Sequence, residues 1–109
     1  MLSNLSLNQY NEIKDQNDAC AFYFSTPDCN VCKVLKPKLF SFLEQTFPNI
    51  KLHYIDLEEN KQLGAELNIF SVPTVLFYFE GKEFLRKSRF INLEELADEI
   101  GRVYNMMFE

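Results

Sequence analysis

The 109-residue chain has no tryptophan, and it has only one histidine and three cysteines. It also lacks an apolar run of about 18 residues, which a membrane-spanning helix would need. Its 16 acidic residues outnumber its 11 basic ones, giving a net charge of −5, whereas a nucleic-acid-binding surface would be basic. The sequence therefore predicts neither a membrane protein nor a nucleic-acid-binding protein.

The first residues lack the features of an export signal. Residues 1–6 have no basic start and no continuous apolar core. We therefore expect a cytoplasmic protein, unless a targeting segment has been removed. A reducing compartment would keep paired cysteines mostly as thiols, which favours a catalytic role over a structural disulfide.

Apolar residues make up 47% of the chain and eleven residues are phenylalanine, which is enough for a sizeable core without disulfide cross-links. A chain of this length is close to the common size of one domain and should bury roughly two-thirds of its unfolded surface. No repeat, low-complexity tract or linker interrupts it. We expect one domain over residues 1–109, and a monomer.

Helical and strand-like patterns alternate along the chain. A capping box at Ser6-x-x-Gln9 predicts the start of a first helix, and Asn92 is expected to cap a last one. Between them, the expected elements are strand 19–25, helix 29–46, strand 50–56, helix 60–67, and a hairpin of strands 74–79 and 83–90. This order predicts an α/β fold, with a central mixed sheet of about four to five strands covered by helices on both faces.

Two cysteines three residues apart, Cys29 and Cys32, lie between the first predicted strand and the helix that follows it. A helix N-terminus carries unpaired N–H groups and the positive end of the helix dipole, which stabilise a thiolate on Cys29. Helical spacing brings Cys32 to the same side, within reach of a disulfide. The position favours thiol–disulfide chemistry, although the spacing alone is weak evidence.

The alternatives for this pair are a chance occurrence or half of a metal site. A closed tetrahedral zinc site needs four ligands, and one such pair supplies two. The single histidine, His53, belongs to a strand far along the chain. We therefore expect no metal and no cofactor, with a site shared by two chains as a minor alternative. The third cysteine, Cys20, lies in an apolar strand and is expected in the core.

Two prolines give this cysteine pair a context. Pro73 opens an apolar strand, where it cannot donate a ladder hydrogen bond, and Pro37 would kink the helix that follows the cysteines. Together with the order of the elements, these features resemble the thioredoxin family over nearly the whole chain. The residues that match the family are Cys29 and Cys32 (the active-site cysteines), Pro37 (the helix-kink proline), Pro73 (the cis-proline facing the disulfide) and Gly81 (the hairpin glycine).

The chain departs from the family pattern close to the cysteines. The family usually has Trp-Cys-Gly-Pro-Cys, whereas this chain has Asp28 before the pair and Asn30-Val31 within it. Tyr23 aligns with the family's buried acid, and Arg89 lies near the position of a glycine that lines the substrate groove. A phenol titrates at about 10 before burial raises its pKa further, so Tyr23 cannot take up a proton near neutral pH.

The resemblance implies a thiol–disulfide oxidoreductase that reduces disulfides in proteins or small molecules. Cys29, at the exposed helix start, is the expected nucleophile, and Cys32 is expected to resolve the mixed disulfide. Val72, Pro73 and Thr74 are expected to bind the substrate, with the Val72 backbone pairing with an extended segment beside a cis Val72–Pro73 bond. A thiol reductase would supply the electrons.

The neighbours of the cysteines are expected to modulate them. Asp28 places a negative charge beside the Cys29 thiolate, and Lys33 raises the local potential. Without the family's proline, Asn30-Val31 leaves the turn less rigid. Phe84 and Phe90 are expected to pack in the core or the hairpin. These departures leave one alternative function open, a non-catalytic thioredoxin-fold binding or redox-sensing module.

Overall fold

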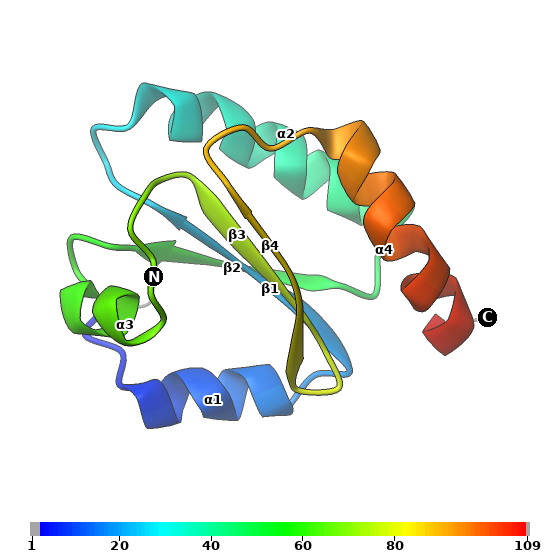
Figure 1. Cartoon of the computed structure of the whole chain (residues 1–109), viewed down its shortest axis with the longest axis horizontal. Helices are drawn as coiled ribbons and strands as arrows, with labels where there is room; N and C mark the ends of the chain where they lie inside the picture. The colour runs from blue at the N-terminus through cyan, green and yellow to red at the C-terminus, as the bar shows by residue number, and fades with distance from the viewer. Residues whose placement is uncertain (1–2, 109) are drawn as a thin grey trace.

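The computed structural model describes residues 3–108, so residues 1–2 and 109 of the predicted domain lie outside the described residues. Helices and strands alternate along this range (Figure 1). Their order is α1 (Leu7–Asp15), β1 (Ala19–Ser25), α2 (Asn30–Thr46), β2 (Lys51–Asp56), α3 (Lys61–Glu66), β3 (Thr74–Phe79), β4 (Lys82–Ser88) and α4 (Leu93–Phe108). The bounds predicted from the sequence are correct to within two residues.

The strands form one sheet in the order β2-β1-β3-β4. β1 runs parallel to β2 and antiparallel to β3, and β3 runs antiparallel to β4. The parallel pair is connected through α2, while β3 and β4 form a hairpin. Gly81 in that hairpin has a φ of +79°, a conformation that costs glycine little. The predicted mixed sheet between helices is thus confirmed.

Two helices cover each face of the sheet. α2 and α4 lie on one face, and α1 and α3 lie on the other (Figure 1). Successive side chains of β1 alternate between these faces, so Tyr23 belongs to the α2–α4 face and Phe22 to the α1–α3 face. Because both faces are covered and β1 is an inner strand, every residue of β1 is buried, which accounts for its continuous apolar run.

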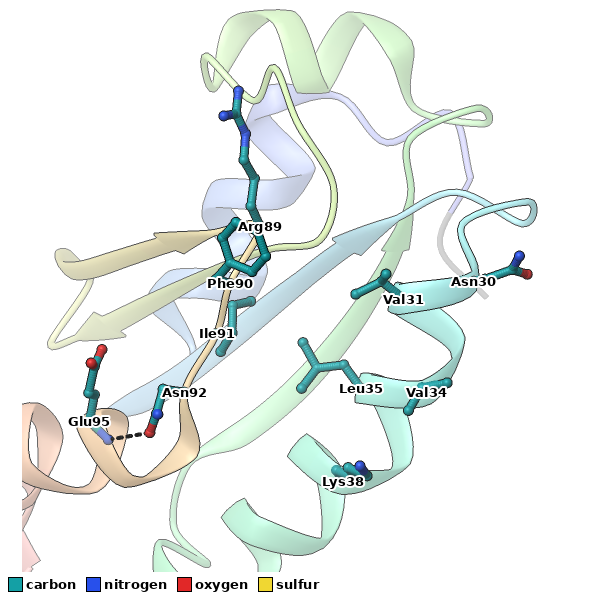
Figure 2. Close-up of a pocket in the computed structure, with 10 residues that line it drawn as sticks. All are labelled: Asn30, Val31, Val34, Leu35, Lys38, Arg89, Phe90, Ile91, Asn92 and Glu95. Carbon is teal, nitrogen blue, oxygen red and sulfur yellow. Dashed lines mark hydrogen bonds between the residues drawn. The ribbon is translucent and has the colours of Figure 1, made fainter.

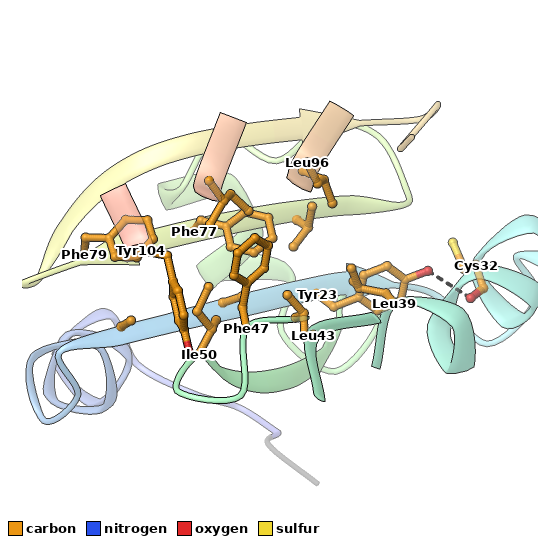
Figure 3. Close-up of a cluster of buried hydrophobic side chains, with 14 residues drawn as sticks. Tyr23, Cys32, Leu39, Leu43, Phe47, Ile50, Phe77, Phe79, Leu96 and Tyr104 are labelled. Carbon is orange, nitrogen blue, oxygen red and sulfur yellow. Dashed lines mark hydrogen bonds between the residues drawn. The ribbon is translucent and has the colours of Figure 1, made fainter. Parts of the chain in front are cut away.

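The core of the α2–α4 face extends as far as the cysteine pair (Figure 3). Leu39 of α2, Phe77 of β3 and Leu96 of α4 are among its fully buried members. Cys32 and Tyr23 belong to the same cluster. The packing that stabilises the sheet therefore also fixes the first turns of α2.

The helix starts follow the sequence signals. Ser6 Oγ accepts from the Gln9 N–H, and Gln9 Oε1 accepts from the Ser6 N–H, which completes the predicted capping box. Asn92 Oδ1 accepts from the Glu95 N–H at 3.0 Å and so caps α4. Within residues 3–108, no helix is long and apolar enough to cross a membrane.

Candidate active site

Cys29 is the N-cap residue of α2, one position before the first helical residue. Its backbone N–H donates to the Thr26 carbonyl oxygen, which closes the turn between β1 and α2. Its Sγ accepts a hydrogen bond of 3.2 Å from the Cys32 backbone N–H. The sulfur thus lies at the positive end of the helix dipole and pairs with an otherwise unpaired helix N–H. Both effects stabilise a thiolate on Cys29.

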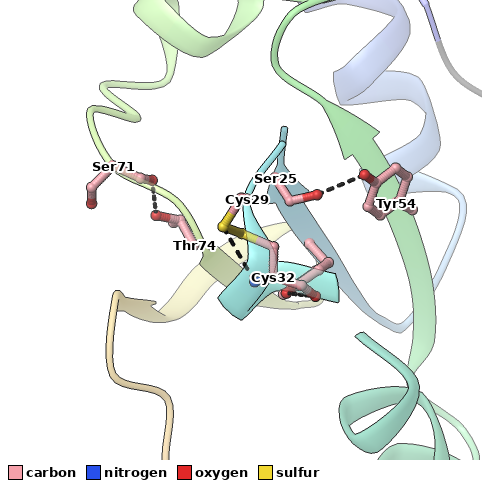
Figure 4. The surroundings of a disulfide bond; sticks show 7 residues. Ser25, Cys29, Cys32, Tyr54, Ser71 and Thr74 are labelled. Atoms are coloured by element: carbon pink, nitrogen blue, oxygen red, sulfur yellow. Dashed lines mark hydrogen bonds between the residues drawn. A yellow bond between two sulfur atoms is a disulfide. The ribbon is translucent and has the colours of Figure 1, made fainter. Parts of the chain in front are cut away.

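Cys29 and Cys32 form a disulfide, with Cα atoms 5.3 Å apart (Figure 4). The two residues differ in exposure, because Cys29 is half-buried and Cys32 is only 2% exposed. Cys32 is held in the core of the α2–α4 face, whereas Cys29 lies at the edge of that core. A substrate can therefore reach Cys29 more easily than Cys32, in agreement with the roles that the sequence predicts for them.

The loop that leads into β3 contains the predicted substrate-binding residues Val72 and Pro73. The peptide bond between them is cis, as the resemblance implied. Val72 is half-buried and contacts the same core cluster as Cys29. Pro73 is buried, and its carbonyl oxygen accepts a hydrogen bond of 2.8 Å from the Arg89 N–H. This bond ties the loop to the segment that follows β4.

Thr74, the third predicted substrate-binding residue, has an inward-facing side chain. It is 1% exposed, and its Oγ1 donates to the Ser71 carbonyl oxygen at 2.7 Å, a bond visible beside the disulfide in Figure 4. The same hydroxyl lies 3.0 Å from Ser88 Oγ at the end of β4. The Thr74 hydroxyl therefore stabilises the conformation of the loop, and its buried side chain supports the site from the interior of the protein.

Tyr23 occupies the position of the family's buried acid and is 1% exposed. Its hydroxyl donates a hydrogen bond of 2.9 Å to the Cys32 carbonyl oxygen (Figure 3). Burial, with a smaller contribution from Tyr54, raises the pKa of Tyr23 from 10 to about 12. The raised pKa agrees with the expected neutral phenol, and the hydrogen-bond partner of that phenol is the backbone of Cys32 rather than its sulfur.

A polar pair beside the cysteines was not predicted from the sequence. Ser25 at the end of β1 and Tyr54 of β2 share a hydrogen bond of 2.6 Å between their hydroxyl oxygens (Figure 4). Lys36 Nζ lies 3.7 Å from the centre of the Tyr54 ring, a cation–π contact. Nothing in the local sequence pattern links these three residues, because they come from three different elements.

The predicted modulating residues Asp28, Asn30, Val31 and Lys33 lie around the start of α2, and all four have exposed side chains. Val31 alone is apolar, and 61% of its surface is accessible. Charges that face water act on one another through a high dielectric and are screened by salt. Asp28 and Lys33 can therefore adjust the reactivity of Cys29 only modestly, and they act in opposite directions.

The remaining candidate ligands do not join the cysteine pair. Cys20 is 1% exposed, as predicted, and burial raises the pKa of its thiol to about 11. His53 stacks on Phe22, a residue of the α1–α3 face, with ring centres 5.1 Å apart. Among the residues that the structure describes, no three cysteine, histidine or acidic side chains gather in a way that could hold a metal ion.

A cleft beside the disulfide was also not predicted. It lies between the start of α2 and the segment 89–92 that leads into α4, has a volume of about 740 Å³, and is called here the α2–α4 cleft (Figure 2). Its apolar lining consists of Val31, Val34, Leu35, Phe90 and Ile91, and its polar lining consists of Asn30, Lys38, Arg89, Asn92 and Glu95. In Figure 2, Val31 and Leu35 of α2 face Phe90 and Ile91 across the cleft.

The expectation that Phe90 packs in the core or hairpin is wrong, because the residue is 93% exposed. Strand β4 ends at Ser88, since Arg89 has a φ of +66° and leaves the extended conformation. The alignment of Arg89 near a family glycine was the signal for this left-handed backbone. Phe84 does contact the hairpin, with its ring edge-on to Phe79 at 5.2 Å, although it is 42% exposed.

Comparison with known proteins shows which protein family the chain resembles. Residues 3–102 match the family model Thioredoxin. Thioredoxin-like protein YdfQ of Bacillus subtilis (strain 168) is 39% identical over 84 residues, which cover 77% of this chain and 74% of that protein. Thioredoxin H2 of Arabidopsis thaliana is 27% identical over 77 residues, which cover 71% of this chain and 57% of that protein.

Solved structures agree with this assignment at the level of the fold. A mutant thioredoxin from Halobacterium salinarum superposes with a TM-score of 0.78 at 22% identity, covering 90% of this chain and 85% of that one. The chain therefore belongs to the thioredoxin family. With its Cys29–Cys32 pair at disulfide distance, it is a thioredoxin-like thiol–disulfide oxidoreductase. The family in general acts on disulfide substrates and works with thiol reductases.

Proposed function

We propose that this protein reduces disulfides of proteins or small molecules through the Cys29/Cys32 dithiol. The observation that carries the proposal is the hydrogen bond of 3.2 Å from the Cys32 N–H to Cys29 Sγ, formed at a half-buried helix start. It gives a thiolate on Cys29 a ready partner and leaves it within reach of a substrate. The burial of Cys32 keeps the second sulfur for the intramolecular step.

The reaction proceeds in two exchanges. The Cys29 thiolate attacks one sulfur of the substrate disulfide, so that a Cys29–substrate disulfide forms and the other substrate sulfur leaves as a thiolate. The Cys32 thiol then loses its proton and attacks Cys29 Sγ, which forms the Cys29–Cys32 disulfide and releases the second substrate thiolate. Two electrons pass from the dithiol to the substrate, and the two released thiolates are protonated by solvent.

Substrate binding is assigned to Val72, Pro73 and Thr74. Val72 is half-buried and packs against the cluster that Cys29 also contacts, and this position supports the proposal that its backbone pairs with an extended substrate segment. Pro73 and Thr74 are buried, and we assign them a supporting role in shaping the loop. Asp28, Asn30, Val31, Lys33 and Tyr23 are assigned to tuning the cysteines.

The remaining parts of the proposal concern the electron donor, the oligomeric state, the location and the cofactors of the protein. Electrons would come from a thiol reductase, as is general in the family. We further propose that the chain acts as a monomeric single domain in the cytoplasm, without metal or cofactor. The runner-up function is a binding or redox-sensing module, which is favoured by the phenol of Tyr23 in place of an acid and by the exposed Phe90.

An insulin reduction assay with dithiothreitol separates these functions. The reductant alone precipitates the insulin B chain after a lag, which a thiol–disulfide catalyst shortens. We expect the wild-type protein and Cys20→Ala to shorten the lag, because Cys20 is buried away from the site. Cys29→Ser should leave the lag as it is without protein. An equal lag with wild-type protein and with Cys29→Ser would refute the proposal in favour of the binding or sensing module.

A further inference from the structure

The two edges of the sheet differ in how well they are protected against pairing with another strand. β4 carries charged side chains along its length, and its ladder with β3 is interrupted by a register shift at Phe77/Tyr78. Both features are ways in which proteins keep an exposed strand from pairing. β2, at the other edge, has charged residues only at its ends, Lys51 and Asp56, and it pairs with β1 in regular register. Within residues 3–108 no further strand covers β2.

The backbone of β2 directs hydrogen-bonding groups to this open edge. The Leu57 N–H, one residue past the strand, donates to the Ser25 carbonyl oxygen of β1 at 2.9 Å. Backbone groups of successive strand residues point to opposite sides, so the odd-numbered residues of β2 face β1. Leu52 and Tyr54 therefore direct their N–H and C=O groups outward, where an added strand can pair with them.

An apolar pocket adjoins the same edge. The side chains of Leu52 and Tyr54 lie on the α2 side of the sheet, and with Pro37 and Phe40 of α2 they line a pocket of about 400 Å³, called here the β2 pocket. Phe40 is 54% exposed. Neither active-site cysteine and no residue of the cis-proline loop lines this pocket. Side chains of an added strand that lie opposite Leu52 and Tyr54 would be on the same face as the β2 pocket.

Charged side chains at the two ends of β2 give the added strand a direction. Lys51 is exposed at the start of β2, and Lys36 Nζ lies 3.7 Å from the centre of the Tyr54 ring. Glu58 and Glu59 are exposed just past the end of the strand. None of these lysines and glutamates forms an ion pair with a described residue. Antiparallel pairing, the more stable kind per residue, then favours a segment with a basic residue first and an acidic residue last.

We propose that the open edge of β2 binds an extended segment of a partner protein as an added antiparallel strand, with an apolar side chain in the β2 pocket and an acidic side chain beside Lys51. The site is separate from the cysteine pair, so the inference goes beyond the proposed function and does not rest on it. A second copy of the chain is less favoured as the occupant, because each copy carries a net charge of −5 and the two would repel.

A designed peptide tests the inference. The eight-residue peptide Lys-Thr-Ser-Thr-Ile-Thr-Phe-Glu places phenylalanine opposite Leu52, isoleucine opposite Tyr54 and glutamate opposite Lys51. Its affinity for the oxidised protein is measured by fluorescence anisotropy. Replacing isoleucine and phenylalanine with serine should weaken binding at least about tenfold, because the burial of both apolar side chains is lost. No binding of the original peptide, or equal binding of the serine peptide, would overturn the proposal.

Methylation of the peptide backbone separates strand pairing from simple apolar docking. N-methyl groups on isoleucine and phenylalanine remove the donors that face Tyr54 and Leu52, so binding should weaken about tenfold. N-methyl groups on the two threonines that flank isoleucine point away from β2 and should change the affinity less than about threefold. Equal losses for the two methylated peptides would contradict an added strand.

Three protein variants locate the site. Phe40→Gln should weaken binding about threefold, since part of the apolar lining is lost. Phe84→Gln is its control, because Phe84 is also exposed (42%) but lies on the β4 edge, and it should keep the wild-type affinity. Lys51→Glu should weaken binding about threefold, and it should favour a peptide that ends in lysine instead of glutamate. All three positions are exposed, so the variants should fold. Unchanged affinity in both Phe40→Gln and Lys51→Glu would refute the assignment.

Amide hydrogen exchange gives a direct view of the edge. In the free protein the amides of Leu52 and Tyr54 should exchange faster than those of His53 and Ile55, and the bound peptide should slow them selectively. Protection of Leu52 and Tyr54 in the free monomer would show that the edge is already closed and would overturn the proposal. Protection that appears without peptide as protein concentration rises, together with dimers in sedimentation, would assign the edge to a second copy instead.

Discussion

Replacing Tyr23 with phenylalanine measures what the buried phenol contributes where the family has an acid. Its hydroxyl donates one hydrogen bond of 2.9 Å, to the Cys32 carbonyl oxygen, and the residue is 1% exposed. A neutral hydrogen bond contributes about 0.5–1.5 kcal/mol net. At pH 7 we therefore expect the free energy of unfolding of Tyr23→Phe to be lower than that of the wild type by about 1 kcal/mol.

The difference should change sign in alkali. Burial raises the pKa of Tyr23 from 10 in the unfolded chain to about 12 in the folded one. The stabilisation from holding this proton is complete below pH 10 and is lost as the pH rises through 12. Linkage gives a loss of about 1.4 kcal/mol by pH 11 and about 2.3 kcal/mol by pH 12, which phenylalanine does not undergo. The two stability curves should cross at about pH 10.7.

Urea unfolding of the oxidised proteins, followed by circular dichroism from pH 7 to 11.5, checks this crossing. Both proteins should carry Cys20→Ala, so that no free thiol exchanges with the Cys29–Cys32 disulfide at high pH. Other titrating groups are shared, and they cancel in the difference between the curves. Parallel curves up to pH 11.5 would refute the raised pKa. A loss above about 3 kcal/mol at pH 7 would show that Tyr23 does more than make one hydrogen bond.

Three further predictions concern the cysteines. Limiting iodoacetamide at neutral pH should label Cys29 before Cys32 and leave Cys20 unlabelled until unfolding, and mass spectrometry that finds Cys20 labelled in the native protein would contradict its burial. Cys32→Ser should trap substrates on Cys29, while Cys29→Ser should trap nothing; adducts through Cys32 would reverse the roles. Asp28→Asn should speed alkylation of Cys29 about threefold, because a carboxylate roughly 7 Å from the Cys29 sulfur in water destabilises the thiolate by about 0.6 kcal/mol. An unchanged rate would mean that the Asp28 carboxylate points away from the sulfur.

The sequence was sufficient for the elements and their order. Continuous apolar runs marked the inner strands β1 and β3, which the sheet buries on both faces. The Ser6–Gln9 capping box and the Asn92 cap fixed two helix starts, because these signals depend only on neighbours in sequence. The cysteine pair was placed correctly at the start of α2 for the same reason, since an N-cap is a local feature.

The α2–α4 cleft was missed because helix α2 has two apolar stripes. Cys32 and Leu39 form the stripe that packs on the sheet, whereas Val31 and Val34 lie on the exposed stripe. Periodicity indicates that a helix is amphipathic but does not say which of two stripes faces the core. The prediction for Phe90 was wrong for a related reason. An aromatic residue that follows a strand pattern is also compatible with a longer strand, so the pattern does not show where the strand ends.

The local contacts support the two exchange steps unequally. The attack by Cys29 is assisted by the helix end and by the Cys32 N–H, both of which act on the sulfur itself. The resolving step needs a proton to leave Cys32, which is 2% exposed, and the neighbouring phenol of Tyr23 is itself protonated near neutral pH. We therefore expect resolution to be the slower step and to quicken as the pH rises.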